Sequence, residues 1–149
     1  MKRIRIVLLA IAVLALVGAS TAVGQRQATV VKFSAVLSAA KEIPHPKGAK
    51  PGAAGLFTAT LTGTTLKWTL TWKNLTGPAS QAHIHIGKPG ISGNVLVPLC
   101  PPGCTSPNHG TWKLTKAQVK LMENGGTYVN VHTTKNNNGE IRGQIARVA

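Results

Sequence analysis

The sequence predicts an all-β protein, specifically an antiparallel Greek-key β-sandwich of about eight strands with one short helix. Short stretches of the chain alternate apolar and polar residues, which is typical of strands that bury one face. Turns rich in Gly, Pro and Asn separate these stretches at the regular spacing that sandwiches show. A helical signature is found at one place in the chain, so helix is a minor part of the expected fold.

The alternating stretches predict the strands in order. In the clearest of them, Leu66, Trp68 and Leu70 alternate with Lys67 and Thr69, as in a strand that is apolar on one face and polar on the other. The expected strands lie at residues 28–37, 55–61, 66–73, 81–87, 94–98, 127–133 and 140–148.

The helix is expected to begin after Thr115, which forms a capping-box pattern with Gln118, and to end at Gly125 and Gly126.

The N-terminus has the pattern of a secretory signal peptide. A basic start is followed by an apolar run at residues 6–17 and by small residues up to Gly24. We therefore predict a signal peptide at residues 1–24 and a single domain at residues 25–149, secreted to the extracellular space or the cell envelope. The apolar run is shorter than the roughly 20 residues that span a bilayer, so no stable membrane insertion is expected after its removal.

The charge balance is strongly positive, with 17 Lys and Arg, three Glu and no Asp, for a formal net charge of +14. Such a charge favours acidic polysaccharide or an anionic cell envelope as a partner; the alternative is a solvated surface that uses Lys. The cations form no dense run, and aromatic residues make up 4% of the chain. Specific nucleic-acid binding is therefore not expected.

Cys100 and Cys104 are the two cysteines of the chain. In a secreted protein, an even number of cysteines predicts a disulfide. The ring that it closes is short, so the bond is expected to hold a loop in place rather than to hold the fold together.

Histidines supply the candidate metal ligands. His83 and His85 alternate with Ala82, Ile84 and Ile86, so both imidazoles should leave the same face of a strand. His132 occupies a similar place beside Asn130 in a later strand. If the two strands are neighbours, three imidazoles can bind a copper or zinc ion. The alternative is that these rings form hydrogen bonds that hold the strands in register.

The last expected strand carries a second polar set, since Glu140, Arg142 and Gln144 alternate with apolar residues and Gly. This set is interpreted either as a cross-strand polar ladder or as a ligand-contacting face continuous with His132 and Asn130.

Several motifs in this order resemble the CHRD (chordin-type) domain family, across about residues 30–148. They lie at residues 33–37, 42–44, 82–85, 128–133 and 139–144. The resemblance implies an extracellular all-β domain with no settled activity. The expected function is a non-catalytic extracellular binding or structural module whose ligand is unknown, and no catalytic residue is assigned.

A fainter likeness connects the chain to copper–zinc superoxide dismutase. His83, His85, His109 and His132 come in the same order as the four copper ligands of that family. The likeness implies, as an alternative function, a histidine-ligated copper or zinc protein with weak superoxide dismutase-like redox activity. Two departures are clear: the chain has no Asp for the zinc site, and its two cysteines share one loop.

Overall fold

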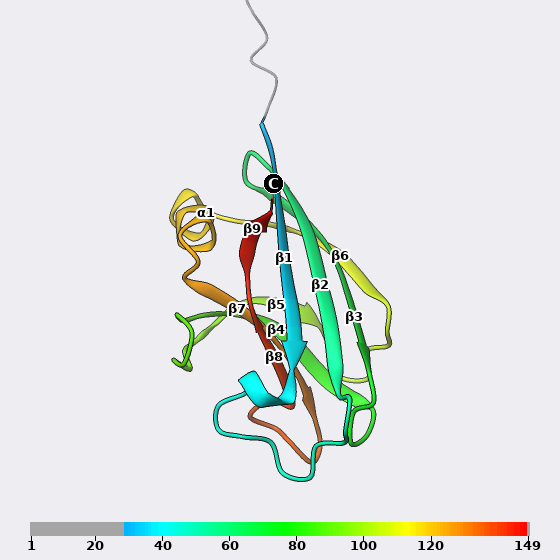
Figure 1. Ribbon diagram of the computed structural model, residues 1–149. Coiled ribbons are helices and arrows are strands. Elements are labelled where there is room, and N and C mark those ends of the chain that lie inside the picture. The colour runs from blue at the N-terminus through cyan, green and yellow to red at the C-terminus, as the bar shows by residue number, and fades with distance from the viewer. Residues whose placement is uncertain (1–28, 149) are drawn as a thin grey trace, which may run out of the picture.

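The computed structural model describes residues 29–148, and the signal peptide predicted at residues 1–24 lies outside them. The described part contains nine strands, one α-helix and one 3-10 turn (Figure 1). In chain order they are β1 (Val30–Ser38), the turn η1 (Ala39–Lys41), β2 (Ala54–Thr62), β3 (Thr65–Lys73), β4 (Ala79–Ile86), β5 (Val95–Cys100), β6 (Asn108–Lys113), α1 (Lys116–Glu123), β7 (Thr127–Thr133), β8 (Ile141–Gln144) and β9 (Ala146–Val148).

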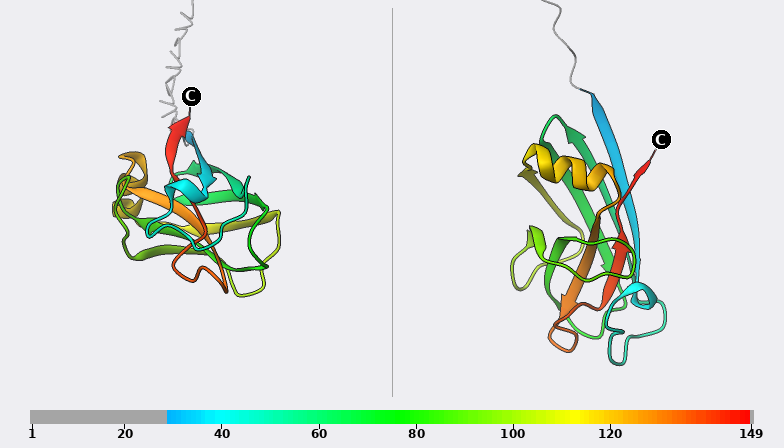
Figure 2. Two further views of the ribbon diagram at one scale, coloured as in Figure 1. Left: turned by 60° about the horizontal axis from the view of Figure 1, so that its bottom comes forward. Right: turned by 90° about the vertical axis from the view of Figure 1, so that its left-hand side faces the viewer.

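The strands form one antiparallel sheet in the order β5-β4-β7-β8-β1-β2-β3-β6, with β9 paired to β1. The sheet curls into a nearly closed, barrel-like shape, as strand twist favours. One flank holds β1, β2 and β3, and the other holds β4, β5 and β7 (Figures 1 and 2). The chain crosses from β3 to β4 on the other flank, and β8 returns beside β1, so neighbours in the sheet are not consecutive in the chain. The prediction of an antiparallel all-β fold is confirmed.

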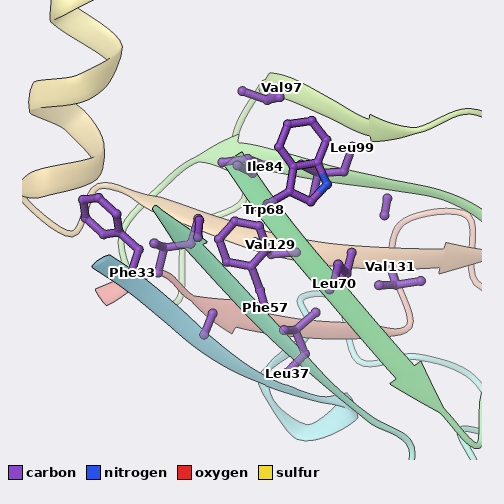
Figure 3. Close-up of a cluster of buried hydrophobic side chains, with 14 of the residues drawn as sticks. Phe33, Leu37, Phe57, Trp68, Leu70, Ile84, Val97, Leu99, Val129 and Val131 are labelled. Atoms are coloured by element: carbon purple, nitrogen blue, oxygen red, sulfur yellow. The ribbon is translucent and has the colours of Figure 1, made fainter. Parts of the chain in front are cut away.

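The apolar core lies between the two flanks of the curled sheet (Figure 3). Phe33, Phe57 and Leu70 enter it from β1, β2 and β3, and Ile84 and Val129 enter it from β4 and β7. Each of these side chains is at most 1% exposed, and burying one contributes about 1.5–3 kcal/mol. The period-two alternation of the sequence therefore identifies the core correctly.

Helix α1 packs over one end of the sheet, where it buries Met122 (Figure 2). The predicted capping box is present: Thr115 accepts from the backbone N–H of Gln118, and the side chain of Gln118 accepts from the backbone N–H of Thr115. The predicted disulfide between Cys100 and Cys104 is also present. Within residues 29–148, no helix has the length and apolar character that crossing a membrane would require.

Two elements differ from the sequence prediction. Strand β6 was not among the expected strands, and its residues are mostly exposed; it is a strand because it pairs with the edge of β3. The single strand expected at residues 140–148 is divided at Ile145, which is fully buried. On one side of this residue β8 pairs with β7, and on the other β9 pairs with β1.

Candidate metal centre

Adjacent strands β4 and β7 bring three histidines together on the outer face of the sheet, the face turned away from the apolar core. His83 pairs with Asn130, and His132 pairs with Gln81 in the register of these strands. On either side of His83 in the chain, Ala82 and Ile84 point inward and are fully buried. The imidazoles therefore share one surface, as the alternation of the sequence predicts.

The three rings converge on one point. His83, His85 and His132 each offer a ring nitrogen, and these nitrogens all lie within 4.8 Å of one another. The closest two are His83 Nδ1 and His132 Nε2, which are 3.1 Å apart. Two nitrogens bound to one ion at about 2.0–2.1 Å lie roughly 2.9–3.4 Å apart for ligand angles between 90° and the tetrahedral value. The spacing of this pair therefore fits two ligands of one metal ion, and it equally fits a hydrogen bond between the two rings.

Backbone carbonyls orient two of the rings. The Nδ1–H of His85 donates to the carbonyl of Gly93, and that of His132 donates to the carbonyl of Asn137, each at 2.8 Å. A carbonyl can only accept, so Nδ1 carries the proton in both rings and Nε2 keeps its lone pair. His85 Nε2 is buried and has no hydrogen-bond partner among residues 29–148. Such carbonyl support is typical of histidines that bind metal.

The local environment keeps the imidazoles neutral. Burial, with the neighbouring His132 and His85, lowers the pKa of His83 to about 4. Burial also lowers the pKa of His85 and of His132, although hydrogen bonds to these rings favour the charged forms and oppose the shift. Neutral imidazole is the form that binds a metal ion. All three imidazoles are therefore uncharged at neutral pH.

Tyr128 and Arg142 build a stack behind His85. The ring of Tyr128 lies parallel to that of His85, with centroids 5.0 Å apart, and the Arg142 guanidinium lies 3.4 Å from the centroid of the Tyr128 ring. A guanidinium over an aromatic face is an attractive arrangement. Nη2 of Arg142 also donates to the carbonyl of Ile91 at 2.8 Å. Arg142 thus joins the strand to the loop at residues 87–94, which supplies Gly93 to His85.

Gln144 fastens the same loop at its base. Its Nε2 lies 2.8–2.9 Å from the carbonyls of Gly87, Gly125 and Thr127. Arg142 and Gln144, predicted from the alternation in the last strand, therefore position the loop that orients a histidine.

Comparison with known proteins identifies the family. The model of the CHRD domain matches residues 33–145. The chain belongs to the CHRD domain family. The matched range includes the three converging histidines, Arg142 and Gln144. No curated protein and no solved structure matches the chain.

The CHRD domain does not bring His109 to the centre, although the order of the histidines suggested a set of four. His109 lies on β6 beside Thr69 of β3, and its side chain is exposed. Strand β6 pairs with β3 at the far end of the sheet order from β4. The predicted four-histidine set is therefore a three-histidine set in the structure.

Glu140 does not share a face with Arg142 and Gln144 as predicted. Its carboxylate accepts from the hydroxyls of Thr76 and Thr133, each at 2.6 Å, and from the side-chain amide of Asn136. Burial would raise the pKa of Glu140, but these hydrogen bonds together hold its pKa below the ordinary value. Glu140 precedes the first residue of β8, so strand alternation does not apply to it.

Glu42, and not Glu140, is the carboxylate that lies near Arg142 and Asn130. The side chain is 1% exposed, and a Cβ at Gly139 would collide with its carboxylate. Burial raises the pKa of Glu42 to about 6, although the charge of Arg142 and the amide of Asn130 oppose the rise. Glu42 was noted in the sequence as part of a family motif, but without a role, because it lies between strands where periodicity gives no direction.

Proposed function

We propose that this CHRD-domain protein is secreted and binds one copper or zinc ion through His83, His85 and His132. The observation that carries the proposal is the convergence of three ring nitrogens within 4.8 Å, two of them on rings oriented by backbone carbonyls. Imidazole suits both metals. The protein would then act as an extracellular binding module with a metal ion as its ligand.

Secretion is supported by the signal-peptide pattern at residues 1–24 and by the disulfide between Cys100 and Cys104, since disulfides persist in oxidising compartments. The net positive charge of the chain opposes the approach of a dication. The rings themselves offset this, because depressed pKa values keep them uncharged at neutral pH.

Binding requires one rearrangement of protons. With no ion bound, His83 Nδ1–H donates to the lone pair of His132 Nε2. To bind the ion, His83 moves this proton to its own Nε2 and presents the Nδ1 lone pair. His85 and His132 already present Nε2. Three protein ligands leave a coordination position for water or a small oxygen species, so weak superoxide dismutase-like redox activity is a second candidate function for the copper form.

Calorimetric titration of the purified, tag-free mature protein with Cu²⁺ and Zn²⁺ tests the proposal. We expect one ion per chain at micromolar affinity or tighter. His83→Ala and His132→Ala should each weaken binding by about 100-fold or more, since each removes one of three metal–nitrogen bonds. The matched controls are His45→Ala and His109→Ala, because both residues lie outside the convergent set. Superoxide dismutation by the copper-loaded form, compared with the zinc-loaded form, tests the redox candidate.

Equal, weak binding by all five proteins would contradict the metal proposal. If His83→Ala and His132→Ala then also lowered the melting temperature more than the controls did, the histidines would instead hold β4 and β7 in register.

A further inference from the structure

The flank opposite the histidines carries a second ordered surface. Strands β1, β2, β3 and β6 lie side by side, and their outward residues form rows across the sheet. We call this surface the basic threonine face. One row is Lys32, Thr60, Lys67 and Thr111; the rows on either side contribute Ser34, Thr58, Thr69 and His109, and Thr62, Thr65 and Lys113.

The face contains a shallow hollow of about 340 Å³. Lys32 and Lys67 line it from either side of Thr60, and Thr58 and Thr69 add further hydroxyls. Adjacent strands are about 4.8 Å apart, so the two lysines emerge roughly 10 Å from each other. Apolar residues complete the lining, namely Phe33, Ala59, Trp68 and Val148. The hollow thus combines apolar surface with hydroxyl groups and flanking positive charges.

Nothing acidic in the described part of the chain neutralises this face. Residues 29–148 contain three carboxylate side chains, and two of them, Glu42 and Glu140, are at most 1% exposed. The third, Glu123, ends α1 and lies near Val31, Leu61 and Gly63 at one end of the face, not at the hollow. The surface charge around the hollow is therefore positive, and it complements a ligand with repeated negative charges.

We propose that the basic threonine face binds an acidic polysaccharide. The lysines pair with carboxylate or sulfate groups on the polymer, and the threonine hydroxyls exchange hydrogen bonds with sugar hydroxyls. Nucleic acid is less suited, because its single strands are bound by stacking on aromatic rings, and the rows named above contain no Phe, Tyr or Trp. This binding needs no metal ion, so it stands apart from the proposed function of the histidines.

The test measures binding of the mature protein to polygalacturonate at low ionic strength, with neutral dextran as the control polymer. The face variant is Lys32→Gln/Lys67→Gln/Lys113→Gln. Its matched control, Lys116→Gln/Lys120→Gln/Lys135→Gln, removes the same charge from exposed lysines outside the face. We expect the face variant to bind about tenfold more weakly, from three exposed charge contacts of roughly 0.5 kcal/mol each, and the control variant to change by less than about threefold.

Both variants should melt at the temperature of the parent protein, because all six lysines are exposed. Equal weakening by the two variants would overturn the proposal, since net charge alone would then explain binding. Equal affinity for dextran would also overturn it. So would tighter binding of duplex DNA with the same dependence on Lys32 and Lys67, which would identify the partner as nucleic acid.

Discussion

The two faces of β7 are equally buried but are covered by different parts of the molecule. All seven residues of the strand are buried. On the inner face, Val129 and Val131 pack in the apolar core, between the two flanks of the sheet. On the outer face, Tyr128, Asn130 and His132 are 2%, 2% and 6% exposed. They lie beneath loops, including those at residues 87–94 and 134–139, which supply carbonyls to the histidines.

Burial therefore has opposite energetic effects on the two sides of this one strand. Apolar burial on the inner face stabilises the fold. Polar burial on the outer face costs free energy wherever a partner is lacking. Among residues 29–148 the outer side contains five such buried atoms: Glu42 Oε2, His85 Nε2, Asn130 Oδ1, Arg142 Nη1 and Gln144 Oε1. The inner face holds the molecule together, whereas the outer face carries the unpartnered polar atoms and the histidines on which the proposed metal site rests.

The largest expected effect comes from the inner face of β4. Ile84→Ala should lower the free energy of unfolding by about 2–5 kcal/mol, because the fully buried side chain leaves a cavity in the core. Chemical denaturation measures this loss. Metal affinity of the folded variant should be unchanged, although Ile84 lies between His83 and His85 in the chain. A loss below about 1 kcal/mol, or a large loss of metal affinity, would break the distinction between the faces.

The second largest effect on stability is expected at a buried polar group outside the histidine cluster. Glu140→Gln should lower the free energy of unfolding by about 1.5–3 kcal/mol, because hydrogen bonds to a charged acceptor are lost and the amide cannot accept on both atoms. Glu123→Gln is the matched control at an exposed carboxylate and should change stability by less than about 0.5 kcal/mol. Equal effects of the two substitutions in denaturation experiments would show that the hydrogen bonds of Glu140 contribute nothing to the free energy of unfolding.

Removing the disulfide should have a smaller effect. The double variant Cys100→Ser/Cys104→Ser should lose about 2 kcal/mol or less, because the bond closes a short ring and restricts the unfolded chain little. Thermal unfolding with and without reductant measures the loss in the parent protein. Metal affinity should again be unchanged. Cys100 is buried in the apolar core, and Cys104 packs against that core. Failure of the variant to fold would mean that this packing, and not the restraint on the loop, is the main contribution of the pair.

The pH dependence of the folding stability of the metal-free protein tests the burial of His83 and Glu42 on the outer face. Histidines in the unfolded chain have a pKa near 6.5, whereas that of folded His83 is about 4. Between these values the unfolded chain binds more protons, so folding stability should fall as the pH is lowered from about 6.5 towards 4. Glu42, whose folded pKa is raised to about 6, contributes in the opposite direction. The variant Glu42→Gln should therefore steepen the loss of stability measured by denaturation across this range.

The smallest expected change is that of metal affinity with pH. Three imidazoles with a pKa near 6.5 would lose about a thousandfold in zinc affinity between pH 7.5 and 5.5 through proton competition. Because the pKa of each of the three histidines is lowered, we expect a loss that is clearly smaller than a thousandfold. Calorimetry at the two pH values decides between these outcomes. A thousandfold loss would show that the rings titrate as exposed histidines do.

Alternation in the sequence was sufficient to predict most strands and their inner faces, because core burial follows the period of the strand. It also predicted that His83 and His85 leave the same face. It could not show that loops would cover that face, since the groups that orient the rings are the carbonyls of Gly93 and Asn137, which carry no side-chain signature. Burial of Glu42 depends likewise on the approach of Gly139, 97 positions away in the chain.

For a related reason, the sequence did not predict strand β6 or the separation of His109 from the other histidines. The residues Asn108–Lys113 are mostly exposed and show no clear alternation; they form a strand because the edge of β3 is free to pair. The linear order of four histidines suggested one site, but order along the chain does not determine order across a sheet. Only the pairing of strands separates His109 from the other three.

The curl of the sheet gives the domain two outward surfaces that face apart, one on β4 and β7 and the other on β1, β2 and β3 (Figures 1 and 2). A molecule adsorbed to a polymer matrix through its lysines would leave its imidazoles turned towards the surrounding medium. Every adsorbed molecule would have the same orientation, so a coated matrix would display a uniform layer of chelating groups. Occupancy of that layer by metal would then follow the density of anchoring charges on the matrix, without any exchange of conformational signals between the two surfaces.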